Sequence, residues 1–189
     1  MRLILASASP RRAELLTSSG FTFDVVPGHV DETPLSGEAP RDYALRVARD
    51  KARTVAHGCR KSGTVVLAAD TVVSCAGEIL GKPADDDDAK RMLKTLSGAV
   101  HEVHTAVVLQ AESRQLCEVT CTRVHVLPLT DSEIRWYVET GEPHGKAGAY
   151  AIQGHAARFI DWIEGSWSNV VGLPVATVYA LLKQLGDVD

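Results

Sequence analysis

Apolar and polar residues repeat along this chain with two periods, which predict its strands and helices. Short apolar or alternating runs predict strands at residues 3–6, 21–26, 64–74, 103–110, 115–127 and 158–163. Helical spacing and start signals predict helices at residues 10–20, 41–57, 89–96, 130–141 and 175–185. A tight turn at 75–78 leads into a short run at 79–80, and 145–154 is expected to be a loop or a strand. This mixture predicts an α/β fold with a mixed sheet.

Three of the predicted helices begin with capping signals. Ser9 is a good N-cap and Pro10 a favoured first helical residue, while Thr130 and Glu133 form a capping box. Four consecutive acids at 85–88 precede the helix at 89–96, where negative charge favours a helix N-terminus. Because these acids lack the spacing and the terminal glutamate of an EF-hand, we interpret them as helix-start residues and not as a calcium site.

Composition narrows the classes of function. Of the 189 residues, 45% are hydrophobic and 23% charged, so a single domain over residues 1–189 with a full core is expected. The formal net charge of −4 argues against a nucleic-acid-binding surface. The N-terminus lacks a signal-peptide pattern, and no apolar run approaches the ~18 residues of a membrane span. We therefore expect a cytoplasmic protein that has neither nucleic acid nor membrane as a partner.

The cysteines and the paired histidines do not predict a metal site. The four cysteines show no C-x-x-C spacing, so free thiols in a reducing compartment are expected: Cys59, Cys75, Cys117 and Cys121. Cys117 and Cys121 share one face of a strand, where structural thiols are the favoured interpretation. His101 and His104 lie three apart at the start of a strand and therefore face opposite ways, which argues against zinc.

Arg11 and Arg12 occupy the first turn of the first helix, beside the positive end of its dipole. Each cation there should cost a few tenths to about 1 kcal/mol. An anion, most simply a phosphate, would explain the pair; the alternative is two solvated arginines on a surface helix.

Asp70 lies inside the apolar run 65–73, where aspartate is depleted. Burying a bare carboxylate costs several kcal/mol, so Asp70 must be paired, metal-bound or at an exposed strand end, and a hydrogen-bonded structural role is the alternative. Lys82 sits in a rigid Gly-Lys-Pro turn that can direct its ammonium into a cleft, whereas Lys51, in the middle of a helix, indicates nothing by itself.

Together these residues form an inventory suited to phosphoryl chemistry. Asp70 and Glu32 could hold a hard divalent cation or activate water. Four cations are candidate phosphate ligands: Arg11, Arg12, Lys51 and Lys82. The P-loop, the dinucleotide-binding G-x-G-x-x-G and the nucleophile-elbow patterns are all missing from the sequence.

An ordered series of motifs resembles the Maf family over essentially the whole chain. The matching segments are 5–12 (LASASPRR), 31–32 (DE), 48–52 (ARDKA), 69–73 (ADTVV), 81–83 (GKP), 97–103, 146–154 (KAGAYAIQG), 165–166 and 169–174 (NVVGLP). One departure is Gly145, where the family pattern often has aspartate before the lysine.

The resemblance implies a nucleoside triphosphate pyrophosphatase that cuts between the α- and β-phosphates and cleans the nucleotide pool. It implies an elongated mixed sheet flanked by helices, with two lobes around a cleft, similar to inosine triphosphate pyrophosphatase. It also implies roles for single residues: Asp70 as general base, Glu32 with Asp70 as metal ligands, Ser9, Arg12, Lys51 and Lys82 on the phosphates, and Arg11, Thr71 and Gln153 in substrate choice.

The resemblance also suggests a substrate. Segment 151–154 is similar to the branch acting on dTTP, UTP and modified pyrimidine triphosphates, and the amide of Gln153 offers the donor and acceptor that a pyrimidine edge needs. The alternatives are a 7-methyl-GTP pyrophosphatase and a nucleotide-binding regulator of septum formation. The expected cofactor is a divalent cation, Mg²⁺ or Mn²⁺ and in some cases Co²⁺. A homodimer is also implied.

Overall fold

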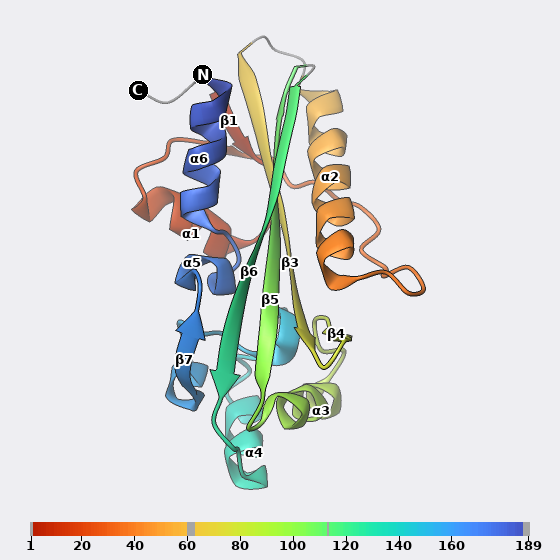
Figure 1. Ribbon diagram of the computed structural model, residues 1–189, viewed down its shortest axis with the longest axis vertical. Helices are drawn as coiled ribbons and strands as arrows, with labels where there is room; N and C mark the ends of the chain where they lie inside the picture. Colours follow the sequence, from red (N-terminus) through yellow and green to blue (C-terminus); the bar gives the residue numbers. More distant parts are fainter. Residues whose placement is uncertain (1, 60–62, 113, 187–189) are drawn as a thin grey trace. The chain divides into compact units, whose positions relative to one another are not determined.

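Seven strands form one mixed sheet within residues 2–59, 63–112 and 114–186, the ranges that the computed structural model describes (Figure 1). They are β1 (Arg2–Leu5), β2 (Asp24–Val25), β3 (Thr64–Cys75), β4 (Glu78–Leu80), β5 (Val100–Ala111), β6 (Arg114–Val126) and β7 (Ile160–Glu164). Their order is β2-β1-β3-β5-β6-β7, with β4 beside β3. β1 pairs in parallel with β2 and β3, whereas β4 pairs antiparallel with β3 and β7 antiparallel with β6. The predicted mixed α/β sheet is confirmed.

Along the chain, helices follow β1, β2, β4, β6 and β7 (Figure 1). The α-helices are α1 (Pro10–Ser18), α2 (Pro40–Gly58), α3 (Asp86–Leu96), α4 (Asp131–Glu139), α5 (Trp167–Val171) and α6 (Val175–Leu185). Two 3₁₀ turns, η1 (Ala147–Ala149) and η2 (His155–Phe159), complete the described elements. Among the described residues, no helix has both the length and the apolar character needed to cross a bilayer.

The chain divides into two compact units, which we describe separately. The first unit contains the described residues of 1–71, 105–120 and 172–189, and the second those of 72–104 and 121–171. Strands β3, β5 and β6 each contribute residues to both units.

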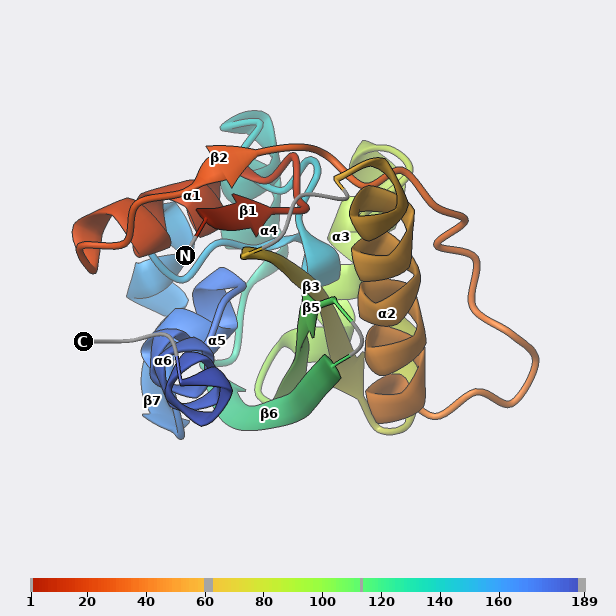
Figure 2. The same cartoon turned by 90° about the horizontal axis from the view of Figure 1, so that it is seen from above.

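One hydrophobic cluster of the first unit lies on one face of its strands. Its buried apolar residues come from β1, α1, β3, β5, α6 and the segment just before α6: Leu3, Leu5, Leu16, Val65, Leu67, Ala69, Val107, Leu109, Leu173, Val178, Leu181 and Leu182. Figure 2 shows α1 and α6 on one side of β3 and α2 on the other. Since side chains alternate along a strand, the odd-numbered β3 residues face this core and the even-numbered ones face α2. This alternation directs Asp70 toward α2.

In the second unit, α3 packs against α4 and η1. Tyr137 of α4 is fully buried, donates its hydroxyl to Glu142 and accepts from the backbone N–H of Ala151. Gly148 lies so close to Val73 that a Cβ there would come within 2.9 Å of a Val73 methyl group. The predicted loop or strand at 145–154 is therefore a tightly packed turn that includes η1.

Most predicted helix starts are confirmed. α1 begins at Pro10 and α6 at Val175, and Thr130 and Glu133 form the complete capping box. The acid run also behaves as interpreted, because Asp85 caps α3 by accepting from the backbone N–H of Asp88 at 2.8 Å.

Three local predictions differ from the structure. Only Asp24–Val25 of the predicted strand 21–26 is extended in the sheet, and α5 was not predicted. The last strand begins at Ile160, because residues before it form η2. The carboxylate of Glu142 accepts from the backbone N–H groups of His155 and Ala156 and so fixes the start of η2. That contact spans 13 residues or more and leaves no local pattern in the sequence.

Candidate active site

Asp70 is paired, and the pair is buried. Lys51 of α2 places its Nζ 2.7 Å from Oδ1 of Asp70, and the two residues are 7% and 6% exposed. Asp70 lies well inside β3, so the exposed strand end that its sequence context allowed is excluded. Its other oxygen, Oδ2, has no hydrogen bond or ion pair to any described residue. The carboxylate is thus held through one oxygen and open at the other.

Glu32 brings a second carboxylate to the same ammonium. Its Oε1 lies 2.6 Å from Lys51 Nζ. Two residues of α2 hold the loop that carries it: Tyr43 donates its hydroxyl to the Glu32 carbonyl at 2.8 Å, and Arg46 donates to the Thr33 carbonyl at 3.1 Å. The predicted pair of Glu32 and Asp70 therefore converges, and Lys51 is the cation on which it converges.

Gly28 lets this loop approach α2. A Cβ at this position would lie 3.0 Å from the carbonyl oxygen of Lys51 and 3.2 Å from its Cα. Contacts this short force a side chain or the backbone to move, so the absence of a side chain at Gly28 permits the close approach of loop and helix.

Arg12 is buried and held by four acceptors of its own unit. Nε donates to the Gly172 carbonyl at 2.8 Å, and Nη1 donates to the Ala69 carbonyl at 2.8 Å and to Ser7 Oγ at 3.0 Å. Nη2 donates to Thr71 Oγ1 at 3.1 Å. A guanidinium has five N–H groups, so one on Nη2 has no acceptor among the described residues. The position of Arg12 in the first turn is thus explained by these acceptors without an anion.

Thr71 completes the arrangement around Arg12. Its hydroxyl accepts from Arg12, bonds Thr105 Oγ1 at 2.9 Å and donates to the Gly172 carbonyl at 3.2 Å. A hydroxyl offers one donor and two acceptor positions, so these three contacts fill them. Gly172 has φ +129°, a conformation that favours glycine.

Arg11 and Ser9 lie at the same helix start. Arg11 is half-buried, and burial lowers its pKa, partly offset by Glu14. Ser9 occupies the predicted N-cap position, but its hydroxyl makes no capping hydrogen bond. The hydroxyl is therefore not needed to complete the helix.

Burial dominates the electrostatics of this cluster. It raises the pKa of Asp70 above the ordinary value of 3.8, while Lys51 and Arg12 partly offset the rise. Burial also lowers the pKa of Arg12 below its ordinary value, and it raises the pKa of Tyr43 to about 12 with a contribution from Asp70. A carboxylate with a raised pKa is a better proton acceptor near neutral pH than an ordinary aspartate.

The two carboxylates fit a hard divalent cation. Mg²⁺ and Mn²⁺ prefer carboxylate oxygens, and Glu32 and Asp70 present oxygens that already converge on one positive charge. The open Oδ2 of Asp70 adds a further oxygen. The donor set is therefore suitable for the cation that the resemblance implies.

Lys82 and Gln153 belong to the second unit. Both are exposed, and the carbonyl of Gly81, next to Lys82, accepts from the backbone N–H of Gly148 at 3.0 Å. Of the predicted site residues, the first unit thus assembles Glu32, Lys51 and Asp70 in one cluster and Arg12 and Thr71 in another. The roles of Lys82 and Gln153 stay predictions.

Sequence reasoning missed the residues that fix this site. Tyr43, Arg46 and Gly28 hold the Glu32 loop, and Gly172 anchors Arg12. The position of Lys51 in the middle of a helix did not by itself predict a functional role. Its spacing from Tyr43 and Val47 would have placed all three near one helix face, and this face covers Asp70.

The mixed sheet defines an α/β protein, and its first unit holds a buried carboxylate–ammonium cluster of Glu32, Lys51 and Asp70. The model of the Maf-like protein family matches residues 2–185, and the chain belongs to this family.

Named relatives cover nearly the whole chain. A protein of Anaeromyxobacter dehalogenans named dTTP/UTP pyrophosphatase is 53% identical over 189 residues, covering 98% of this chain and 94% of the relative. One of Geobacter sulfurreducens with the same name is 52% identical over 187 residues, with 98% and 97% covered. The Staphylococcus aureus Ham1 protein has a similar structure, with a TM-score of 0.54 and 12% identity over 98% of this chain and 100% of that protein. This last similarity concerns the fold alone.

Proposed function

We propose that this protein hydrolyses dTTP and UTP, releasing the nucleoside monophosphate and pyrophosphate. Two relatives at 53% and 52% identity over nearly their full length carry the name of that activity. The observation that carries the proposal in the structure is the buried Asp70, held by Lys51 through one oxygen and open at the other.

The reaction that we propose is attack of water on the α-phosphorus. Oδ2 of Asp70 accepts a proton from the water as the new P–O bond forms, and the bond from the α-phosphorus to the bridging oxygen breaks to release pyrophosphate. Lys51 fixes the orientation of Asp70, since its Nζ holds Oδ1. The remaining N–H of Arg12 Nη2 can donate to a phosphate oxygen without disturbing its four existing contacts.

Glu32 and Asp70 would hold the divalent cation. A bound Mg²⁺ or Mn²⁺ supplies charge neutralisation on the phosphate oxygens. Ser9, Lys51 and Lys82 are proposed as further phosphate-binding residues. Arg11 and Gln153 are proposed to determine substrate choice, with Gln153 binding the pyrimidine. Because the Thr71 hydroxyl is already saturated, any influence of Thr71 on substrate choice would act through the position of Arg12.

The test is release of pyrophosphate from dTTP, UTP and 7-methyl-GTP, each with Mg²⁺, with Mn²⁺ and with a chelator. We expect cation-dependent release from dTTP and UTP, with 7-methyl-GTP the poorest substrate. Release from 7-methyl-GTP alone would support the pyrophosphatase reaction and contradict dTTP and UTP as the substrates. No release from any triphosphate would contradict the proposed enzymatic activity and favour a nucleotide-binding role. A cytoplasmic location and a homodimer stay predictions.

A further inference from the structure

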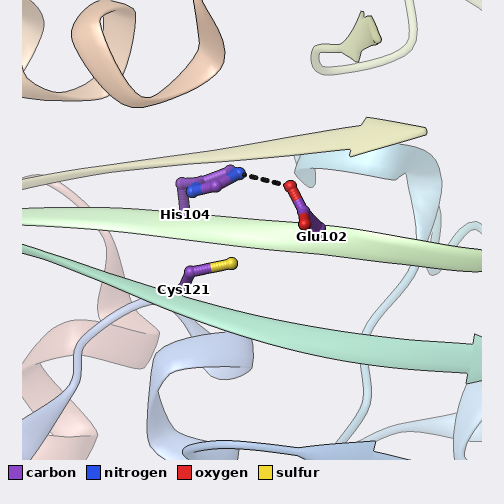
Figure 3. Close-up of side chains that lie close together, drawn as sticks. All are labelled: Glu102, His104 and Cys121. Carbon is purple, nitrogen blue, oxygen red and sulfur yellow. Dashed lines mark hydrogen bonds and ion pairs between the residues drawn. The ribbon is translucent and has the colours of Figure 1, made fainter. Parts of the chain in front are cut away.

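One face of β5 and β6 in the second unit brings together three different metal-binding side chains. Glu102 and His104 are two residues apart on β5 and so share a face, and Cys121 lies on the neighbouring β6 (Figure 3). Their ligand atoms all lie within 4.8 Å of one another. Among residues 2–59, 63–112 and 114–186, this is the only group of three or more such side chains at this spacing.

The two histidines of β5 have different surroundings. His101 is 1% exposed, its Nε2 lies 2.8 Å from the Tyr150 hydroxyl, and burial lowers its pKa to about 4. His104 faces the other way, as the strand pattern predicts, and its Nε2 lies 3.1 Å from Glu102 Oε2. Glu102 and Cys121 lie on two different strands, so the spacing of His101 and His104 in the sequence gave no sign of this group.

The thiol distinguishes the group from an ordinary histidine–glutamate pair. Cys121 is exposed and belongs to no disulfide, as predicted for the cysteines of this chain. The imidazole of His104 is only 13% exposed, so the neighbouring strands restrict its position, whereas Glu102 is 51% exposed and can rotate. One restricted ligand and two adjustable ones form a site that can close around an ion.

The basic side chains on the same face of β6 are each paired with a carboxylate. Arg123, two residues beyond Cys121, pairs with Glu164 at 2.6 Å. His125, two residues further, pairs with Asp161. A bound cation would therefore meet little uncompensated positive charge along β6.

We propose that Glu102, His104 and Cys121 bind Zn²⁺, with water in the fourth position. Thiolate and imidazole select zinc over Mg²⁺ and Mn²⁺, which prefer oxygen ligands. Bonds of about 2.0–2.3 Å in a tetrahedral site place ligand atoms about 3.5 Å apart, so a spacing within 4.8 Å requires only side-chain rotation. This site is independent of the proposed pyrophosphatase and of the oxygen ligands Glu32 and Asp70.

Binding changes the protonation of the ligands. The Cys121 thiol loses its proton to solvent and becomes a thiolate. The neutral His104 ring binds through Nε2, so its proton resides on Nδ1 and the hydrogen bond from Nε2 to Glu102 is exchanged for two bonds to the ion. One proton is released to solvent for each ion bound when Cys121 begins as a thiol.

The experiment is a titration with Co²⁺, a spectroscopic substitute for zinc, in the presence of excess Mg²⁺ to occupy the oxygen site. We expect one equivalent of Co²⁺ to produce a thiolate-to-cobalt absorption band, and one equivalent of Zn²⁺ to abolish it. Cys121→Ser should remove the band, and His104→Asn should weaken binding at least about tenfold. Cys117→Ser is the matched control, since Cys117 is another exposed thiol of β6 and contacts Arg49 instead.

The proposal is overturned if the wild-type protein gives no thiolate band, or if Cys121→Ser keeps it. It is also overturned if Cys117→Ser removes the band equally, because the thiol would then be another one. Circular dichroism of each variant checks folding. If Cys121→Ser does not fold, the Co²⁺ affinity of Glu102→Gln and of His104→Asn tests the proposal instead. An unchanged affinity in both variants would contradict the zinc site.

Discussion

Lys51 Nζ and Asp70 Oδ1 lie 2.7 Å apart and join the middle of α2 to the middle of β3. Both residues are more than nine-tenths buried. Removing one partner of such a pair leaves an uncompensated buried charge and costs about 3–5 kcal/mol, although the intact pair contributes little net stability. The pair therefore serves to position the carboxylate of Asp70.

Asp70→Asn should lower turnover of dTTP about a hundredfold to ten-thousandfold, because the amide cannot accept the proton of the attacking water. Nucleotide binding should be largely kept, since Arg12 and Lys51 stay in place. Pyrophosphate release measures the first effect, and equilibrium binding of a non-hydrolysable nucleotide measures the second.

Asp50→Asn is the matched control for this variant. Asp50 lies beside Lys51 on α2 but pairs with the exposed Arg53 at 3.4 Å. The turnover of the Asp50→Asn variant should equal that of the wild type. Near-normal turnover in Asp70→Asn would show that another group accepts the proton.

The pH dependence of kcat/KM follows from the raised pKa of Asp70. Only the deprotonated carboxylate can act as base, so kcat/KM should fall as the pH falls through the folded-state pKa. Because burial raises this pKa above 3.8, the acid limb should lie at higher pH than for an ordinary aspartate. A profile that stays flat down to pH values near 3.8 would contradict the assignment.

The same shift has a consequence for stability. The folded state holds the Asp70 proton more tightly than the unfolded state does, so the Asp70 contribution to stability declines as the pH rises from 3.8 through the folded-state pKa. Denaturant unfolding of the wild type and of Asp70→Asn over this window should show a smaller pH slope in the variant. Equal slopes in the two proteins would mean that groups other than Asp70 cause the pH dependence of the free energy of unfolding.

Arg12→Lys should destabilise the first unit, because an ammonium cannot reach the four acceptors that the planar guanidinium contacts. We expect the free energy of unfolding to fall by about 2–4 kcal/mol, as measured by urea denaturation. Arg11→Lys, one residue earlier and half-buried, should change it by less than about 0.5 kcal/mol. Equal effects of the two substitutions would contradict a structural role for Arg12.

The sequence predicted those parts of the fold that local patterns determine. The capping box at Thr130, the proline at position 10 and the acids before α3 all depend on neighbours within four residues, and each is confirmed. The η2 turn depends instead on Glu142, which lies 13 residues from His155. Contacts at that separation leave no periodic signal.

Local sequence patterns also indicated some residues of the candidate site and missed others. The apolar run of β3 identified Asp70 as an anomaly, because aspartate is costly in that setting. Lys51 was predicted only as a phosphate ligand, and nothing in the sequence paired it with Asp70, since it lies on a helix with several other cations. Arg12 illustrates the opposite case: its helix position suggested an anion, whereas the Gly172 carbonyl, 160 residues away, already supplies an acceptor.

Gly28→Ala tests whether the Glu32 loop must lie against α2. The new Cβ would come within 3.0 Å of the Lys51 carbonyl oxygen, so the loop would have to move by a few tenths of an ångström. Overpacking of this kind costs about 1–3 kcal/mol, and the movement would shift Glu32 relative to Lys51 and Asp70. We expect a decrease in kcat/KM of about tenfold, with a higher Mg²⁺ concentration required for half-maximal rate.

Gly58→Ala is the control for that loop, because a Cβ at Gly58 would meet no atom within 4 Å. It should leave kcat/KM unchanged and keep or slightly raise stability, since alanine reduces the conformational freedom of the unfolded chain. If Gly28→Ala loses stability but keeps its Mg²⁺ requirement, the loop serves only packing and Glu32 does not hold the cation. If the Mg²⁺ requirement rises in Gly28→Ala alone, the approach of the loop to α2 controls the cation site through Glu32.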